Sequence, residues 1–142
     1  MTKYEKYLDA VCESEILYMT TNNRELPAQS LRVGGDYGIF INESHYETTA
    51  ERLVATAHEI AHCKTGALYS LDTPLFERER YEHRAWKSTI HDLLPFDELK
   101  AAMIDCTYHD GLDIYELADK KDVTVEFVTR AIEHYCNRGY RW

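Results

Sequence analysis

Several features that would direct a chain to a membrane or to an oxidising compartment are missing from this sequence. It contains no apolar run of about 18 residues, the length that a membrane-spanning helix needs. The first residues, MTKYEKYLDAVCES, include no apolar signal core. The four cysteines are widely spaced and form no Cys-x-x-Cys pair, which favours reduced thiols over disulfides. We therefore expect a soluble, cytoplasmic protein with no membrane partner.

Positive charge is also scarce. The chain has 16 Lys and Arg residues against 25 Asp and Glu residues, which gives a formal net charge of -9 at pH 7. No local cluster of Lys and Arg offsets this excess, so the surface would repel phosphate backbones. Nucleic acid is therefore not an expected partner.

Linkers, internal repeats and low-complexity segments are absent as well. A chain of 142 residues, 44% of them hydrophobic and 29% charged, is long enough for one core and short for two. We expect a single domain over residues 1–142 with an α+β fold, in which a small antiparallel sheet packs on helices. The expected parts are an N-terminal helix and small sheet over 1–43, a helix over about 44–66, a helix over about 74–94 and a C-terminal helical region over 96–142.

Three short β-favouring runs define the expected sheet. They are ILYMTT, QSLRV and YGIFIN, and turn-forming residues separate them. An open sheet edge can accept an added strand. We therefore expect YGIFIN, which precedes the next helix, to pair with an extended peptide segment.

Capping residues mark both ends of the helix that follows the sheet. Ser44 with Glu47, and Thr48 with Glu51, form two overlapping Ser/Thr-x-x-Glu capping boxes that can start a helix. Gly66 can end it. These signals predict one helix with defined ends around the most informative motif of the chain.

That motif is the His-Glu-x-x-His pattern in ATAHEIAHCKTG. Four residues turn an α-helix by about 400° and advance it by about 6 Å, so His58 and His62 project from one face on adjacent turns. Zinc binds imidazole nitrogens, and a catalytic zinc site has three protein ligands and one open position. The motif predicts His58 and His62 as zinc ligands and Glu59 as a general base that accepts a proton from water.

The other side of this helix is apolar and can pack on the sheet. It carries Leu53, Ala57, Ile60 and Ala61. Two histidines at this spacing can occur by chance in a chain with seven. Chance alone would not also supply helix caps and an apolar opposite face, so we favour a metal site over two surface histidines.

A third ligand has to come from another segment, and the next helix offers three acidic residues. At about 100° per residue, Glu79 lies roughly 60° from Glu82, whereas Glu77 points about 140° away. Glu82 shares its face with the small residue Ala85, which would let two helices approach closely. We choose Glu82 as the third ligand and keep Glu79 in reserve.

The remaining histidines and Cys63 are not expected to bind metal. The histidines, each isolated in the sequence, are His45, His83, His91, His109 and His134. Cys63 points away from the ligand face, which favours a packed thiol. Among the eleven tyrosines, the sequence identifies none as an oxyanion donor.

The C-terminal segment suggests a different class of function. YELADKKDVTVEFVTRAIEHY is expected to form two helices joined by a tight turn, with Thr124 as the second N-cap, and this arrangement is typical of a helix-turn-helix. Between Asp110 and Asn137, however, there are seven acidic and three basic residues, a net charge of -4. Because a recognition helix needs positive charge, we favour two helices that close a core.

Four segments, in one order along most of the chain, resemble a known family. They are YGIFINES, LVATAHEIAHCKTG, RYEHRAWKSTIHDLLPFDEL with its Glu-x-x-Ala step, and IYELADKKDVTVEFVTRAIEHY. The set resembles the ImmA/IrrE family of zinc metallopeptidases, particularly the short forms of bacteriophages and mobile elements. One difference is Ala61, where the family often has Gly before its second His.

The resemblance implies a zincin-like His-Glu-x-x-His helix in which His58, His62 and Glu82 bind Zn²⁺ and Glu59 is the base. It also implies a zinc-dependent endopeptidase that cleaves a helix-turn-helix repressor of a phage or mobile element. Two alternatives belong to other classes. One is a non-catalytic, zinc-stabilised antirepressor that binds its target without cutting it, and the other is a helix-turn-helix DNA-binding regulator.

Overall fold

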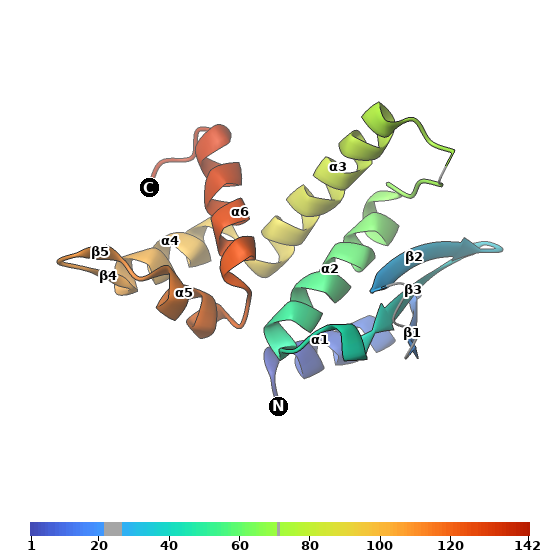
Figure 1. Cartoon of the computed structure of the whole chain (residues 1–142), viewed down its shortest axis with the longest axis horizontal. Coiled ribbons are helices and arrows are strands. Elements are labelled where there is room, and N and C mark those ends of the chain that lie inside the picture. Colours follow the sequence, from blue (N-terminus) through green and yellow to red (C-terminus); the bar gives the residue numbers. More distant parts are fainter. Residues whose placement is uncertain (22–26, 71) are drawn as a thin grey trace. The chain divides into compact units, whose positions relative to one another are not determined.

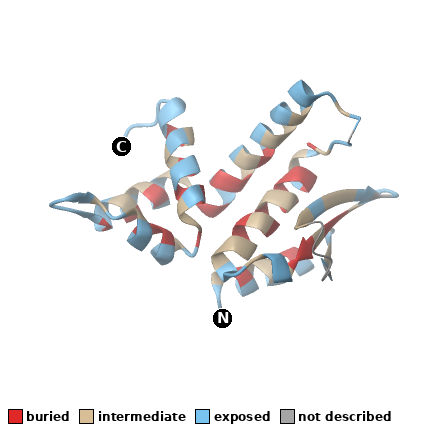
Figure 2. Ribbon diagram, viewed as in Figure 1, coloured by how far each residue is buried: buried red, intermediate tan, exposed pale blue. Residues whose placement is uncertain are grey.

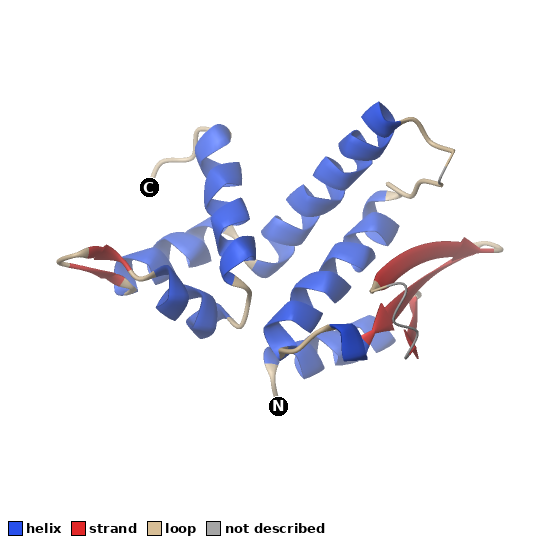
Figure 3. Cartoon of the chain, in the orientation of Figure 1, coloured by secondary structure: helices blue, strands red, loops and turns tan. Residues whose placement is uncertain are grey.

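The computed structural model describes residues 1–21, 27–70 and 72–142. Helices and small sheets are combined as the predicted α+β fold requires (Figure 3). The chain forms two compact units, Met1–Thr89 and Ile90–Trp142. The first unit contains α1 (Lys3–Cys12), β1 (Leu17–Thr21), β2 (Ala28–Val33), β3 (Asp36–Asn42), the 3₁₀ turn η1 (Glu43–His45), α2 (Thr49–Thr65) and most of α3 (Leu75–Leu93). The second contains the end of α3, α4 (Phe96–Asp105), β4 (Thr107–Tyr108), β5 (Gly111–Leu112), α5 (Ile114–Lys121) and α6 (Val125–Asn137).

The sheet of the first unit is mixed, with strand order β1-β3-β2 (Figure 1). β3 pairs antiparallel with β2 and parallel with β1. The expectation of a wholly antiparallel sheet is therefore wrong at β1, because β3 inserts between the two strands that precede it. Its central position matches its composition, since Ile39 and Ile41 are completely buried.

The core of the first unit forms where α2 contacts β2, β3 and α1. One buried cluster joins Val11 of α1, Ile39 of β3, and Ile60 and Cys63 of α2. The face of α2 that was predicted to be apolar is buried along its length (Figure 2). Burial of the larger side chains on this face, Leu53 and Ile60, contributes about 1.5–3 kcal/mol each. This packing fixes the orientation of α2, and with it the direction of its polar face.

Two of the predicted capping residues, Thr48 and Gly66, cap α2 in the structure. The helix begins at Thr49, later than the predicted residue 44. Thr48 is the N-cap and its side chain accepts a hydrogen bond from the Glu51 amide. Ser44 instead lies in η1 and donates to Asn42 Oδ1. At the other end, Gly66 has φ +68°, the left-handed conformation that glycine adopts without strain and that commonly ends a helix.

In the second unit, α5 and α6 are joined by a tight turn in which Thr124 caps α6, as predicted. Tyr135 of α6 is completely buried and its hydroxyl donates to the Leu94 carbonyl at 2.7 Å. The expected helical region 96–142 is interrupted by the β4–β5 hairpin, which was not predicted. Among the residues described, no helix is both long and apolar enough to cross a membrane.

Candidate metal centre

Three predicted ligands converge in the first unit. His58 Nε2 lies 2.8 Å from Glu82 Oε2, and His62 Nε2 lies 3.1 Å from Glu82 Oε1. The two Nε2 atoms are 3.2 Å apart. Within the described parts of the chain, these three residues form the group of three or more His, Cys, Asp and Glu side chains that could hold one ion. α2 supplies both imidazoles and α3 supplies the carboxylate.

The donor set fits zinc. Four ligands at about 2.0–2.1 Å in a tetrahedron place their donor atoms about 3.3 Å apart. The observed separations between the donor atoms are slightly shorter, 2.8 to 3.2 Å, which are hydrogen-bonding distances. Two imidazole nitrogens and one carboxylate oxygen are a common zinc ligand set, and they leave a fourth position open.

Contacts behind the two imidazoles hold them in the orientation that a metal requires. His62 Nδ1 is 2.7 Å from the Ala67 carbonyl, to which it donates, so when the ring is neutral its proton is on Nδ1 and Nε2 has the lone pair that a metal needs. Ala67 follows the left-handed turn at Gly66, which ends α2 beside the histidine. The His58 ring stacks on Trp86, with centroids 4.0 Å apart and planes at 29°. Its Nδ1 is buried without a hydrogen-bond partner in the described part of the chain.

Glu82 is held as a carboxylate by its neighbours. Burial alone would raise its pKa, but hydrogen bonds from His58, His62 and Tyr69 outweigh burial and keep that pKa well below its usual value. The Tyr69 hydroxyl donates to Glu82 Oε1 at 2.7 Å. Burial, together with Glu82, raises the pKa of Tyr69 to about 12, so the tyrosine stays protonated and remains a donor at neutral pH. Glu79, the reserve ligand, is exposed on α3 and lies outside the group.

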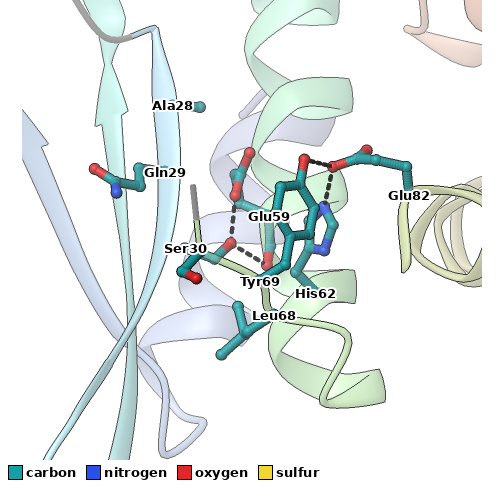
Figure 4. Close-up of a pocket in the computed structure, with 9 residues that line it drawn as sticks. Ala28, Gln29, Ser30, Glu59, His62, Leu68, Tyr69 and Glu82 are labelled. Carbon is teal, nitrogen blue, oxygen red and sulfur yellow. Dashed lines mark hydrogen bonds and ion pairs between the residues drawn. The ribbon is translucent and has the colours of Figure 1, made fainter. Parts of the chain in front are cut away.

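Glu59 lines a cavity of about 250 Å³ together with two of the ligands, His62 and Glu82 (Figure 4). Its carboxylate does not belong to the metal-ligating group. Ser30 Oγ contacts a Glu59 carboxylate oxygen and lies 2.9 Å from the Glu59 backbone carbonyl. A carboxylate next to a metal-ligand set and facing a cavity is placed to exchange a proton with a bound molecule.

The sheet edge at this cavity is β2. YGIFIN was expected to accept an added strand, but it lies in β3, which pairs on both sides. That expectation is wrong because strand order places β3 in the centre. Among the strands of the described residues, β2 pairs with β3 alone, and Ala28, Gln29 and Ser30 line the cavity (Figure 4).

The cysteines and the remaining histidines lie outside the group of three candidate ligands, as predicted, but two of those histidines contact each other. Cys63 is buried in the core, and burial raises its pKa to about 11, which fits a packed thiol. The four cysteines are free. His45, His83 and His109 lie outside the metal-ligating group. His91 and His134 were expected to be isolated, but the fold brings their Nε2 atoms to 3.1 Å.

Zinc affinity should fall as the solution is acidified, because protons compete with zinc for the imidazoles. Burial alone would lower the pKa of His62, but hydrogen bonds to Glu82 and the Ala67 carbonyl, and the charge of Glu82, raise it above 6.5. A raised pKa means that His62 begins to bind a proton at a higher pH than a free histidine. Affinity should therefore be full above this pKa and decline below it, by up to about tenfold per pH unit for each ligand that protonates.

Zinc titration against a competing chelator across this pH range measures the effect. His109→Ala is the control, because His109 is exposed in the β4–β5 turn and its loss should leave the profile unchanged. An affinity that stays constant from alkaline to acidic pH would contradict the assignment of imidazole ligands.

Comparisons of the chain with family models, with curated proteins and with solved structures give no match.

Proposed function

We propose that the chain is a zinc-dependent endopeptidase in which His58, His62 and Glu82 bind Zn²⁺ and Glu59 is the general base. The observation that carries the proposal is that these three ligand atoms meet beside a cavity that a second carboxylate also lines. A structural zinc site is normally closed by four protein ligands, whereas a catalytic site has three. In the described residues the group has three members.

Each side chain has a separate role in the proposed reaction. Zinc bound here would act as a Lewis acid toward water and toward a substrate carbonyl. Glu59 accepts a proton from the attacking water and passes it to the leaving amine. Ser30 contacts both the carboxylate and the backbone carbonyl of Glu59, which orients this base at the cavity. Tyr69 donates to Glu82 and restrains the third ligand.

The free edge of β2 is the proposed binding surface for the substrate backbone. An extended peptide that adds to β2 would gain main-chain hydrogen bonds, with specificity from alternate side chains. Because Ala28, Gln29 and Ser30 line the cavity with Glu59, a peptide on this edge would pass the proposed base. The cut segment would then have to adopt β geometry.

For the substrate, we propose a helix-turn-helix repressor of a phage or mobile element. The resemblance to the ImmA/IrrE family supports this choice. Charge also supports it, because a chain with net charge -9 is attracted to a basic DNA-binding protein. The same charge is unfavourable for a DNA-binding role of α5 and α6, whose buried residues Leu117, Phe127 and Val128 contribute to a core.

The test is to incubate the full chain with the repressor encoded beside its gene, with and without a chelator. We expect discrete repressor fragments with zinc and intact repressor with chelator, as seen by mass spectrometry. A complex that forms in zinc, relieves repression and yields no fragments would favour the antirepressor instead. A shift of DNA mobility by this chain alone at low salt would favour the DNA-binding regulator.

A further inference from the structure

A second pair of histidines lies in the Ile90–Trp142 unit. His91 is in the last turn of α3 and His134 is in the last turn of α6. Their Nε2 atoms are 3.1 Å apart and their ring planes meet at 88°. We propose that this pair is a second metal site, which binds a divalent late transition metal such as Zn²⁺ or Cu²⁺ through two imidazoles, with water at the remaining positions.

The separation of the nitrogens fits two ligands on one ion. Nitrogens at about 2.0–2.1 Å from zinc that subtend about 100° lie about 3.1 Å apart. The Nε2 atoms of His58 and His62, the pair in the first unit, are at nearly the same distance, 3.2 Å. Imidazole is a suitable ligand for Zn²⁺, Ni²⁺ and Cu²⁺, and Cu²⁺ should bind the tightest of the three.

One buried side chain supports both rings. Tyr135 is completely buried, and its ring centroid is 5.4 Å from that of His91 and 5.2 Å from that of His134. Its hydroxyl is fixed by the hydrogen bond to the Leu94 carbonyl. Ligands that pack on a rigid element lose little freedom on binding an ion. His91 itself is exposed, so an ion could reach the pair from solvent.

The local electrostatics favour a cation. Both histidines occupy the last turn of a helix, where the helix macrodipole gives a partial negative charge. The chain as a whole has a net charge of -9. An Nε2–H···Nε2 hydrogen bond between neutral imidazoles would give the same separation. Metal binding by the purified chain distinguishes a metal site at His91 and His134 from such a hydrogen bond.

A metal at this site would connect segments 43 residues apart in the sequence. Because the unfolded chain would not hold the two imidazoles together, an ion at 100 times its dissociation constant would raise the folding equilibrium constant about 100-fold. The site would thus stabilise the contact between the end of α3 and α6 independently of any peptidase activity.

The test is a titration of the chelator-treated full chain with Zn²⁺ alone near neutral pH, followed by calorimetry and native mass spectrometry. We expect two zinc ions per wild-type chain, and one per chain in His91→Ala and in His134→Ala. His109→Ala, which removes another exposed histidine of the same unit, should keep two. A zinc content in His91→Ala and His134→Ala equal to that of the wild type would overturn the proposal.

A second measurement separates this site from the one in the first unit. His62→Ala should lose that first zinc and keep the second, and zinc should still raise its unfolding midpoint. Adding His91→Ala to this variant should remove that rise. If the rise persists in the double variant, the pair at His91 and His134 is not the ligand set, whatever the outcome for the peptidase.

Discussion

Glu59→Gln is expected to reduce hydrolysis of a repressor substrate by about 10²–10⁴-fold, the usual contribution of a general base, with little change in zinc affinity. Gln has nearly the same shape as Glu and can keep the contact with Ser30. It cannot accept a proton from water at neutral pH. Because Glu59 lies outside the three-residue ligand group, zinc should remain bound.

Single-turnover cleavage and zinc content, measured on the same preparation, test this expectation. Glu79→Gln provides a matched control, because it makes the same chemical change at an exposed position on α3. The control should cleave at the wild-type rate. If Glu59→Gln retains zinc and also cleaves at the wild-type rate, another group is the base.

The same variant separates the enzyme from the antirepressor. If the chain acts by binding alone, Glu59→Gln should relieve repression as well as the wild type does, since the substitution leaves the β2 edge and the zinc ligands in place. If cleavage is required, the variant should bind the repressor without releasing the gene that it controls. A reporter assay combined with fragment analysis distinguishes the two outcomes.

The parts of the fold that the sequence predicted are those with local causes. Thr48, Thr124 and Gly66 act within one helical turn, and each marks a helix end in the structure. Strand order is not local, because any strand with two apolar faces can occupy the centre of a sheet. The parallel pairing of β1 with β3 and the resulting free edge on β2 were therefore missed.

The β4–β5 hairpin was missed for another reason. Each strand has only two residues, too few for an alternating pattern of apolar and polar side chains. The usable signal was Gly111, which follows the turn residues His109 and Asp110 and has φ +114°, a backbone conformation that favours glycine.

In the candidate metal site, too, the residues that the sequence predicted are those placed by local helical geometry, and those that it missed are brought in by the fold. Helical geometry alone places His58 and His62 on one face, and helical phase separates Glu82 from Glu77. Ser30 and Tyr69 reach the cavity from a strand and from the segment after α2, so no spacing in the sequence connects them to the motif. His91 and His134, 43 residues apart, could not be paired without the fold.

Glu82→Gln is expected to lower zinc affinity by more than about 100-fold, because loss of a partner behind a ligand already costs about 10–100-fold and this change removes a ligand charge itself. The carboxylate now accepts from His58, His62 and Tyr69, and an amide could satisfy only part of that arrangement. Cleavage should be lost together with the zinc. The share of the stabilisation by zinc that comes from this first site should be lost as well.

Glu79→Gln is again the appropriate comparison, since helical phase had left Glu79 as the alternative ligand. Equilibrium dialysis with Zn²⁺ should show near wild-type affinity at the first site for this control and a large loss for Glu82→Gln. The reverse result would mean that α3 rotates when zinc binds, so that Glu79 replaces Glu82. Equal and small effects of both substitutions would mean that α3 supplies no ligand, and the two histidines of α2 would then need a third partner from elsewhere in the chain.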